Sequence, residues 1–345
     1  MSKQEANIYE IAKEAGVSIA TVSRVMNRSA FVSEKSTRRV MEAVQKLNYV
    51  PNSMARSLST SVSMSVGVVV PDINNPFFSK ILKGVTAVAD EKGYQVVLYS
   101  SDEQEEKEQK ILHTMREHRL RGIIIIPVSE DSQETLDRLK GFASKSMPVV
   151  LLDREVDDPT FDRVVTEDEE GVYQAVCALI RGGHKKIAIV TGPQRSRTGK
   201  ERLRGYERAM KEFGLPLREE YIRHGDFRMD RAYEETMALC ALEEPPTAIF
   251  SSNNMTTYGC LKAFSTLGLE LGKDMALIGF DDIETLRWLN YDVSVVCRDV
   301  DGMGRRAMEM LLECFGREES AEVGRKETMP MELVLRGSEL CSKRL

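Results

Sequence analysis

Short apolar runs alternate with longer amphipathic stretches from Ser65 onward, and this alternation limits the folds open to the chain. Continuous apolar runs separated by helical patterns indicate parallel strands buried on both faces, as in doubly wound α/β structure. There are too many runs for one modest sheet, so we expect two α/β lobes. The runs are Val66–Val70, Val96–Tyr99, Ile123–Ile126, Val149–Leu152, Ile187–Val190, Ala248–Phe250 and Ala276–Ile278.

The first sixty residues have a different texture, with no strand-like run. Apolar residues recur there at helical spacing three times, which predicts three short helices. Gly16 ends the first helix, Ser18 begins the second as an N-cap, and Ser33 does the same for the third. Pro51 closes this all-α unit. The periodic residues are Ile8, Ile11, Ala12 and Ala15, then Ala20, Val22 and Val25, then Val40, Met41, Val44 and Leu47.

The charge of the chain is unevenly distributed. Its formal net charge is -6, but residues 1–62 carry nine Lys/Arg and five Asp/Glu, whereas the remainder carries 39 and 49. A small basic head on an acidic body is typical of a DNA-binding module attached to something else.

Several classes of protein are not expected. The six cysteines and four histidines are scattered without metal-ligand spacing, and we find no nucleophile with a base and no cofactor fingerprint. We therefore expect no metal, no cofactor and no enzymatic activity. No apolar stretch is long enough to span a membrane and no export signal begins the chain, so we expect a cytoplasmic protein.

The segments 8–27 (IYEIAKEAGVSIATVSRVMN) and 49–58 (YVPNSMARSL) closely resemble the helix-turn-helix and hinge of the lactose-repressor (LacI/GalR) family of transcription regulators. Independently of that resemblance, Ser18, Thr21, Ser23 and Asn27 are short polar side chains that can reach phosphates from a helix in the major groove. The alternative is a solvated helix face.

The resemblance implies which residues read the DNA bases. Ile19, Ala20 and Arg24 occupy the family's base-reading positions. The two apolar residues can contact a thymine methyl group, and Arg24 can donate two hydrogen bonds to guanine O6 and N7.

The resemblance also implies a hinge helix over residues 52–58. Asn52 and Ala55 would contact DNA there, and Leu58 would insert into the minor groove as an apolar wedge. The alternative for Leu58 is a linker leucine that packs on the body.

By the same resemblance the chain has three parts. Residues 1–50 form the helix-turn-helix domain, 51–62 the hinge helix or linker, and 63–345 an effector-binding and dimerisation domain similar to periplasmic sugar-binding proteins. Recognition of a palindromic operator implies a homodimer. The tail 337–345 is too short for the tetramerisation helix that some family members add.

Matching motifs place an effector site between the two lobes, where acids, amides and guanidinium groups can bind hydroxyls and aromatic rings can pack on a sugar or a base. For Phe77, Phe78 and Asp281 the alternative is a capping or turn role. The implied site residues are Phe77, Phe78, Asp153, Arg202, Phe227, Asn253, Asp281 and Arg298.

The body departs from the family pattern at two site positions. Residue 298, usually glutamine, is arginine, and residue 254, often aspartate, is asparagine. Arg195, Arg197 and Lys200 add three cations to one nearby loop. Two interpretations follow for Arg298: an effector that carries a phosphate or carboxylate, or an internal salt bridge to Asp153 or Asp281.

Two charged runs, 102–110 and 167–170, are expected to be solvated helix faces. The segment 192–200 suggests a phosphate-binding loop but lacks the required glycine and serine or threonine.

The predicted function is therefore a sequence-specific DNA-binding regulator, most simply a repressor, whose small sugar-like effector changes the relative orientation of the lobes. The competing interpretations are a plain solute-binding protein, which leaves the head unexplained, and a regulator controlled by a protein co-regulator.

Overall fold

The computed structural model describes residues 7–27, 31–49, 63–118, 120–143, 147–316 and 323–341. The chain divides into two compact units, Met1–Ser63 and Met64–Leu345, which we call the head and the body. Across the described residues, no helix is both long and apolar enough to cross a membrane.

The head contains the three expected helices, α1 (Ile8–Ala15), α2 (Ile19–Asn27) and α3 (Glu34–Lys46). Ser18 and Ser33 accept backbone hydrogen bonds at the starts of α2 and α3, which confirms both predicted N-caps. Gly16 ends α1 with a φ of 59°, a left-handed conformation that favours glycine. A small core that includes Ile11, Val22 and Val40 joins the three helices.

The first lobe of the body, which we call the N-lobe, is built on a parallel six-stranded sheet in the order β11-β5-β4-β3-β1-β2. Helices α5 and α13 share one core with this sheet, and α6 and α7 share another. The strands are β1 (Ser65–Val70), β2 (Gln95–Ser100), β3 (Ile123–Ile125), β4 (Val149–Leu152), β5 (Asp162–Thr166) and β11 (Lys326–Met329). The helices are α5 (Pro76–Glu91), α6 (Glu105–Glu117), α7 (Gln133–Ala143) and α13 (Val300–Cys314).

The second lobe, the C-lobe, has a six-stranded sheet in the order β12-β10-β9-β8-β6-β7, in which only the pairing of β12 with β10 is antiparallel. Its strands are β6 (Ile187–Thr191), β7 (Ile222–His224), β8 (Ala248–Ser251), β9 (Ala276–Phe280), β10 (Ser294–Arg298) and β12 (Met331–Val334). Its helices are α8 (Asp168–Arg181), α9 (Arg197–Glu212), α10 (Met229–Cys240), α11 (Asn254–Leu267), α12 (Glu284–Trp288) and the 3-10 turn η1 (Glu219–Tyr221).

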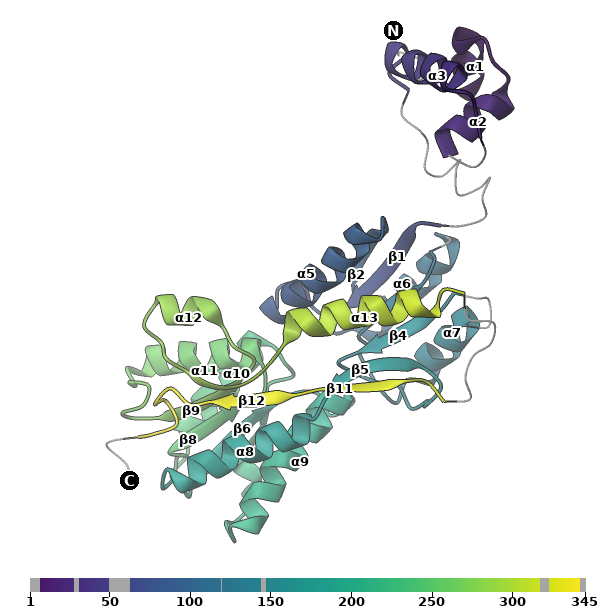
Figure 1. The fold of residues 1–345 in the computed structure, drawn as a ribbon. Coiled ribbons are helices and arrows are strands. Elements are labelled where there is room, and N and C mark those ends of the chain that lie inside the picture. Colours follow the sequence, from purple (N-terminus) through teal and green to yellow (C-terminus); the bar gives the residue numbers. More distant parts are fainter. Residues whose placement is uncertain are drawn as a thin grey trace. The chain divides into compact units, whose positions relative to one another are not determined.

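The chain crosses between the lobes three times: from β5 to α8, from β10 to α13 and from β11 to β12 (Figure 1). The prediction of two doubly wound lobes is confirmed. Each predicted apolar run forms a strand, but β2 is an edge strand, with Leu98 42% exposed, and is not buried on both faces. The remaining strands were not predicted, because each includes at least one charged residue and does not read as a continuous apolar run; these are β5, β7, β10, β11 and β12.

Candidate functional site

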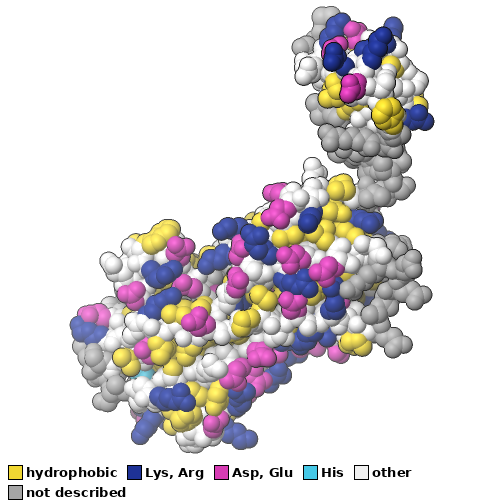
Figure 2. Space-filling view, in the orientation of Figure 1, with side chains coloured by type: hydrophobic (Ala, Val, Ile, Leu, Met, Phe, Trp, Pro, Cys, Tyr) yellow, Lys and Arg dark blue, Asp and Glu magenta, His cyan; other side chains and the backbone are white. Residues whose placement is uncertain are grey.

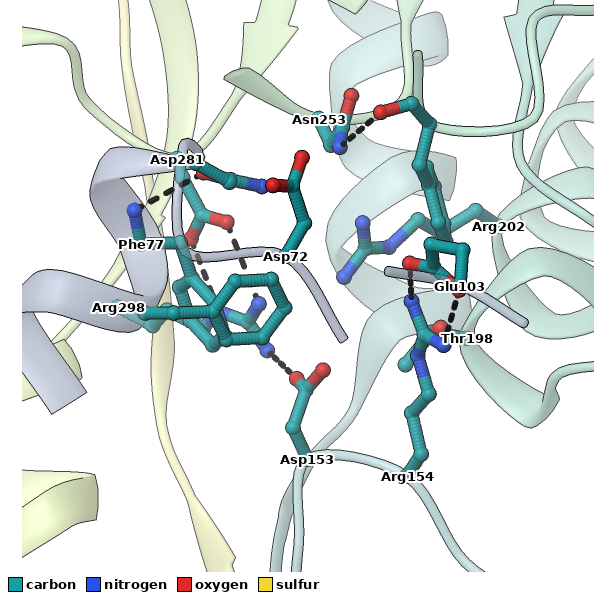
Figure 3. Close-up of a pocket in the computed structure, with 13 residues that line it drawn as sticks. Asp72, Phe77, Glu103, Asp153, Arg154, Thr198, Arg202, Asn253, Asp281 and Arg298 are labelled. Carbon is teal, nitrogen blue, oxygen red and sulfur yellow. Dashed lines mark hydrogen bonds and ion pairs between the residues drawn. The ribbon is translucent and has the colours of Figure 1, made fainter. Parts of the chain in front are cut away.

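All eight predicted effector residues line one pocket between the lobes of the body (Figure 3). They come from loops and helix starts that follow the strands, because parallel strands carry their chain to one edge of each sheet. The complete lining is Asp72, Asn75, Phe77, Phe78, Glu103, Asp153, Arg154, Thr198, Arg202, Phe227, Asn253, Asp281 and Arg298.

Asp153 and Asp281 occupy equivalent positions in the two lobes. Each directly follows a buried strand, β4 or β9, and each has a left-handed backbone, with φ of 64° and 67°. Aspartate tolerates this conformation better than most residues. The turn directs both carboxylates at the same guanidinium group, although the two residues are far apart in sequence (Figure 3).

That guanidinium group belongs to Arg298, at the end of β10. Its Nη1 atom lies 2.6 Å from Asp153 Oδ1 in the N-lobe and 2.8 Å from Thr166 Oγ1, and its Nε atom lies 2.9 Å from Asp281 Oδ1 in the C-lobe. The Arg298 side chain is 1% exposed. Burial lowers its pKa, but Asp281, Asp153 and Asp168 together raise it above the ordinary value for arginine. Of the two interpretations of Arg298, the structure therefore contains the internal salt bridge.

Arg202, on α9, is also neutralised by the protein itself. It pairs with Asp168 at 2.7 Å and donates to the carbonyl oxygen of Ser252 at 2.5 Å. Burial raises the pKa of Asp168, but Arg202 and Arg298 lower it below the usual value. Arg202 and Arg298 thus share Asp168, which begins α8 at a crossover between the lobes.

Two sequence predictions are wrong in part, although Glu106, Lys107 and Glu167 are exposed as expected. The runs 102–110 and 167–170 were expected to be solvated, but Asp168 is 1% exposed, Glu108 is fully buried and Glu103 forms a bidentate ion pair with Arg154. A buried carboxylate requires a partner, and for Glu103 and Asp168 that partner is an arginine distant in sequence. The spacing of charges within a run carries no information on such a partner.

Two arginine side chains of the pocket contact the faces of phenylalanine rings in its lining or beside it. Arg298 lies over the rings of Phe77 and Phe280, and Arg202 lies over Phe280, at 3.5 Å, and over Phe227. Such cation–π contacts are strongest where water is excluded. A Cβ atom on Gly192 would lie 2.1 Å from the Phe227 ring, so a larger residue at that place would displace the ring.

The capping alternative fails for Phe77 and Phe78, whereas the Asp281 carboxylate accepts hydrogen bonds from Arg298. Asn75, not Phe77 or Phe78, caps α5, because its Oδ1 accepts from the amide of Phe77. Asn253 does cap α11 through a reciprocal box with Thr256, and it donates to the carbonyl oxygen of Phe227. Asp72, Asn75, Glu103, Arg154 and Thr198 were not among the predicted site residues; the position of Asp72 and Arg154 after strands was the available signal.

The pocket has little free space in this conformation. Its free volume is about 20 Å³, which is roughly the room that one water molecule needs. A monosaccharide or a nucleobase does not fit unless the lobes separate.

The predicted DNA-reading side chains of the head are mostly accessible. Ser18, Ile19, Ala20 and Arg24 are exposed on α2 or at its start, and Thr21 is half-buried and bonded to Ser18. Ser23 is half-buried. Tyr9, 68% exposed, shares an open surface with Ser18 and Ile19 and was not predicted. The side chain of Asn27 and the predicted hinge residues Asn52, Ala55 and Leu58 lie outside the described residues.

Basic side chains are prominent on the visible face of the head, as expected for a nucleic-acid-binding unit (Figure 2). A helix-turn-helix head and a body of two lobes with a polar pocket between them define a ligand-responsive DNA-binding regulator.

The family comparisons agree with this class. Residues 7–52 match the family of bacterial regulatory proteins of the lacI type, and residues 63–333 match the family of periplasmic binding proteins and sugar-binding domains of the LacI family. The chain belongs to the LacI family and is a DNA-binding transcriptional repressor rather than an enzyme.

Several relatives and solved structures match most of the chain. The HTH-type transcriptional repressor PurR of Actinobacillus pleuropneumoniae is 33% identical over 96% of this chain and 98% of its own length, and that of Vibrio vulnificus is 33% identical over 89% and 91%. The lac repressor dimer bound to operator and the anti-inducer ONPF is 26% identical, covers 98% of this chain and 100% of its own, and has a TM-score of 0.84. The CelR–cellobiose complex is 25% identical over 96% and 99%, with a TM-score of 0.71.

Proposed function

We propose that the protein is a homodimeric repressor that binds a palindromic operator and is controlled by a small, uncharged, polar metabolite bound between the lobes of the body. The observation that carries the effector class is the internal neutralisation of Arg298 and Arg202 by Asp153, Asp281 and Asp168.

The charge of the pocket argues against an anionic effector. Its lining holds four carboxylates, on Asp72, Glu103, Asp153 and Asp281, against three guanidinium groups. A phosphate or carboxylate would have to displace one of these carboxylates from its arginine and leave a buried charge without a partner. Hydroxyl groups or ring nitrogen atoms can exchange hydrogen bonds with the same side chains without changing the net charge.

The three cations that suggested an anionic effector are also occupied. Arg197 lies 2.8 Å from Glu155, Lys200 lies 2.6 Å from Glu130, and Arg195 donates to the carbonyl oxygen of Glu103. None of them extends into the pocket lining. They therefore do not provide a phosphate-binding loop.

Support for the dimer, the operator and a small-molecule effector comes from the lac repressor structure, a dimer with both operator and anti-inducer bound. The CelR–cellobiose complex supports a neutral sugar as one candidate ligand. We propose Ser18, Ile19, Ala20, Thr21, Ser23, Arg24 and Asn27 as the DNA-contacting set in each head.

The test is a thermal-shift screen of the full chain against neutral sugars, including cellobiose and ribose, nucleobases, sugar phosphates and sugar acids. We expect stabilisation by an uncharged compound and no stabilisation by its phosphorylated form. The hit is then titrated into a complex with DNA selected from a random-sequence pool, with sedimentation used to measure the dimer. Coupling between sites commonly changes affinity by about 5-fold to 150-fold.

Stabilisation only by anionic compounds would refute the effector class. A hit that leaves DNA affinity unchanged would refute the coupling. A folded sample that responds to no compound would instead favour control by a protein co-regulator.

A further inference from the structure

The ion pairs between the two lobes have a consistent direction of charge. Among the described residues, every ion pair between the lobes joins a cation of the C-lobe to a carboxylate of the N-lobe. Outside the pocket these pairs are Arg195 with Glu105, Arg197 with Glu155, Lys200 with Glu130 and Asp131, and Arg228 with Asp102. We call these nine residues the interlobe strip.

The strip lies at the loops that face each other across the pocket. Its carboxylates follow β2, β3 and β4 of the N-lobe, and its cations follow β6 and β7 of the C-lobe. A backbone hydrogen bond accompanies it, in which the amide of Glu130 donates to the carbonyl oxygen of Arg195 at 2.9 Å. This bond joins the lobes directly and breaks when they separate.

The geometry points to a charge latch: we propose that the interlobe strip stabilises the closed arrangement of the lobes, so that its strength sets how often the effector site opens. The inference rests on the proposed function, because it concerns access to the proposed effector site. About 20 Å³ of free space remains in the closed pocket, so a metabolite can enter only when the lobes separate.

The physical basis is the placement of the charges. Because one lobe contributes only cations to these pairs and the other only carboxylates, each cation of the strip is attracted by every carboxylate of the strip across the gap, and not by its own partner alone. Several members are substantially exposed: the side chains of Arg228 and Asp102 are 55% and 43% exposed, and that of Lys200 is 34% exposed. Exposed pairs are screened by salt, so closure weakens as ionic strength rises.

The latch has a consequence for effector binding. The apparent affinity of a ligand is reduced by the fraction of molecules in the binding-competent state. Weakening the strip therefore raises the rate at which a ligand associates with the protein, without changing any residue that lines the pocket.

The experiment measures hydrogen–deuterium exchange of the full chain without ligand or DNA, in the peptide that contains the Glu130 amide. Lys200→Glu replaces two attractions with repulsions, and Lys200→Glu combined with Glu130→Lys restores one of the pairs. The matched control is Lys273→Glu, the same charge change at a lysine that pairs with Glu270 inside the C-lobe.

We expect Lys200→Glu to speed exchange of this peptide by about threefold or more, the order expected from losing exposed ion pairs. Combining Lys200→Glu with Glu130→Lys should bring the exchange rate back towards that of the wild type, and Lys273→Glu should not change it. Salt at 0.5 M should speed exchange in the wild type. Exchange in β1 reports whether each variant is folded.

Exchange that does not respond to Lys200→Glu or to salt would overturn the latch. So would an equal response to Lys273→Glu, because that would indicate general destabilisation. Since no ligand or operator is used, failure of the latch leaves the proposed function standing, and failure of the effector screen leaves this result unaffected.

Discussion

Replacing Arg298 with glutamine tests the electrostatic design of the pocket most directly. The guanidinium group lies within 2.9 Å of a carboxylate oxygen of both Asp153 and Asp281, and these three side chains are 1%, 6% and 5% exposed. The substitution removes the cation and leaves buried carboxylates facing one another. Removing one partner of a buried pair costs about 3 to 5 kcal/mol of unfolding free energy.

The assay is thermal and urea unfolding of the full chain, followed through the transition of the body. A loss of this size lowers the midpoint on the order of 10 °C for a unit of this length. Arg305→Gln is the matched control, because Arg305 is 44% exposed and pairs with Asp301 on the surface, where solvent screens the pair and the midpoint should stay close to that of the wild type.

The pH dependence adds a second signature. Arg298 is one of the two arginines that lower the pKa of Asp168, so the wild type gains stability above the ordinary value of 3.8 and loses it as pH falls through the lowered pKa. The Arg298→Gln variant gains less stability from the Asp168 carboxylate, because it has lost one of the two arginines that lower the pKa of Asp168. The difference between the two proteins should therefore be largest at neutral pH and should shrink below about pH 4. A loss under about 1 kcal/mol that does not vary with pH would refute this reasoning.

Three further predictions concern other parts of the chain. Burial raises the pKa of Glu108 to about 7, so the wild type should lose stability as pH rises from about 4.5 to about 7. Urea titrations at several pH values should show that Glu108→Gln flattens this loss. An unchanged dependence of stability on pH would contradict the prediction. Gly205→Ala should lower the free energy of unfolding by about 1 to 3 kcal/mol, because the added Cβ would lie 2.4 Å from the carbonyl oxygen of Glu169. Thermal unfolding measures this loss, and a neutral result would mean that α8 and α9 can separate freely. Arg24→Ala should weaken operator binding by about 1 to 3 kcal/mol and relax specificity at one guanine in fluorescence titrations, whereas a uniform loss over all sequences would make Arg24 a phosphate contact.

Local patterns were sufficient to predict the architecture. The apolar runs identify β1 and β9 because a parallel strand covered on both faces must be apolar throughout, whatever its neighbours are. The caps at Ser18 and Ser33 follow from the backbone amides that any helix start leaves unpaired. Edge strands such as β11 escaped prediction, because one side of such a strand faces solvent and its sequence is mixed.

The sequence by itself also identified eight of the thirteen residues that line the pocket, because positions after parallel strands converge at one edge and the family motifs mark them. It did not determine their partners. Arg298 meets Asp153, and Lys200 reaches Glu130, because three chain crossings bring the two lobes together. Glu103 meets Arg154, and Arg298 meets Asp281, because the chain segments at the strand ends of one sheet lie at one edge. Ion pairs form between groups that are close in space, and only the tertiary structure decides which groups those are.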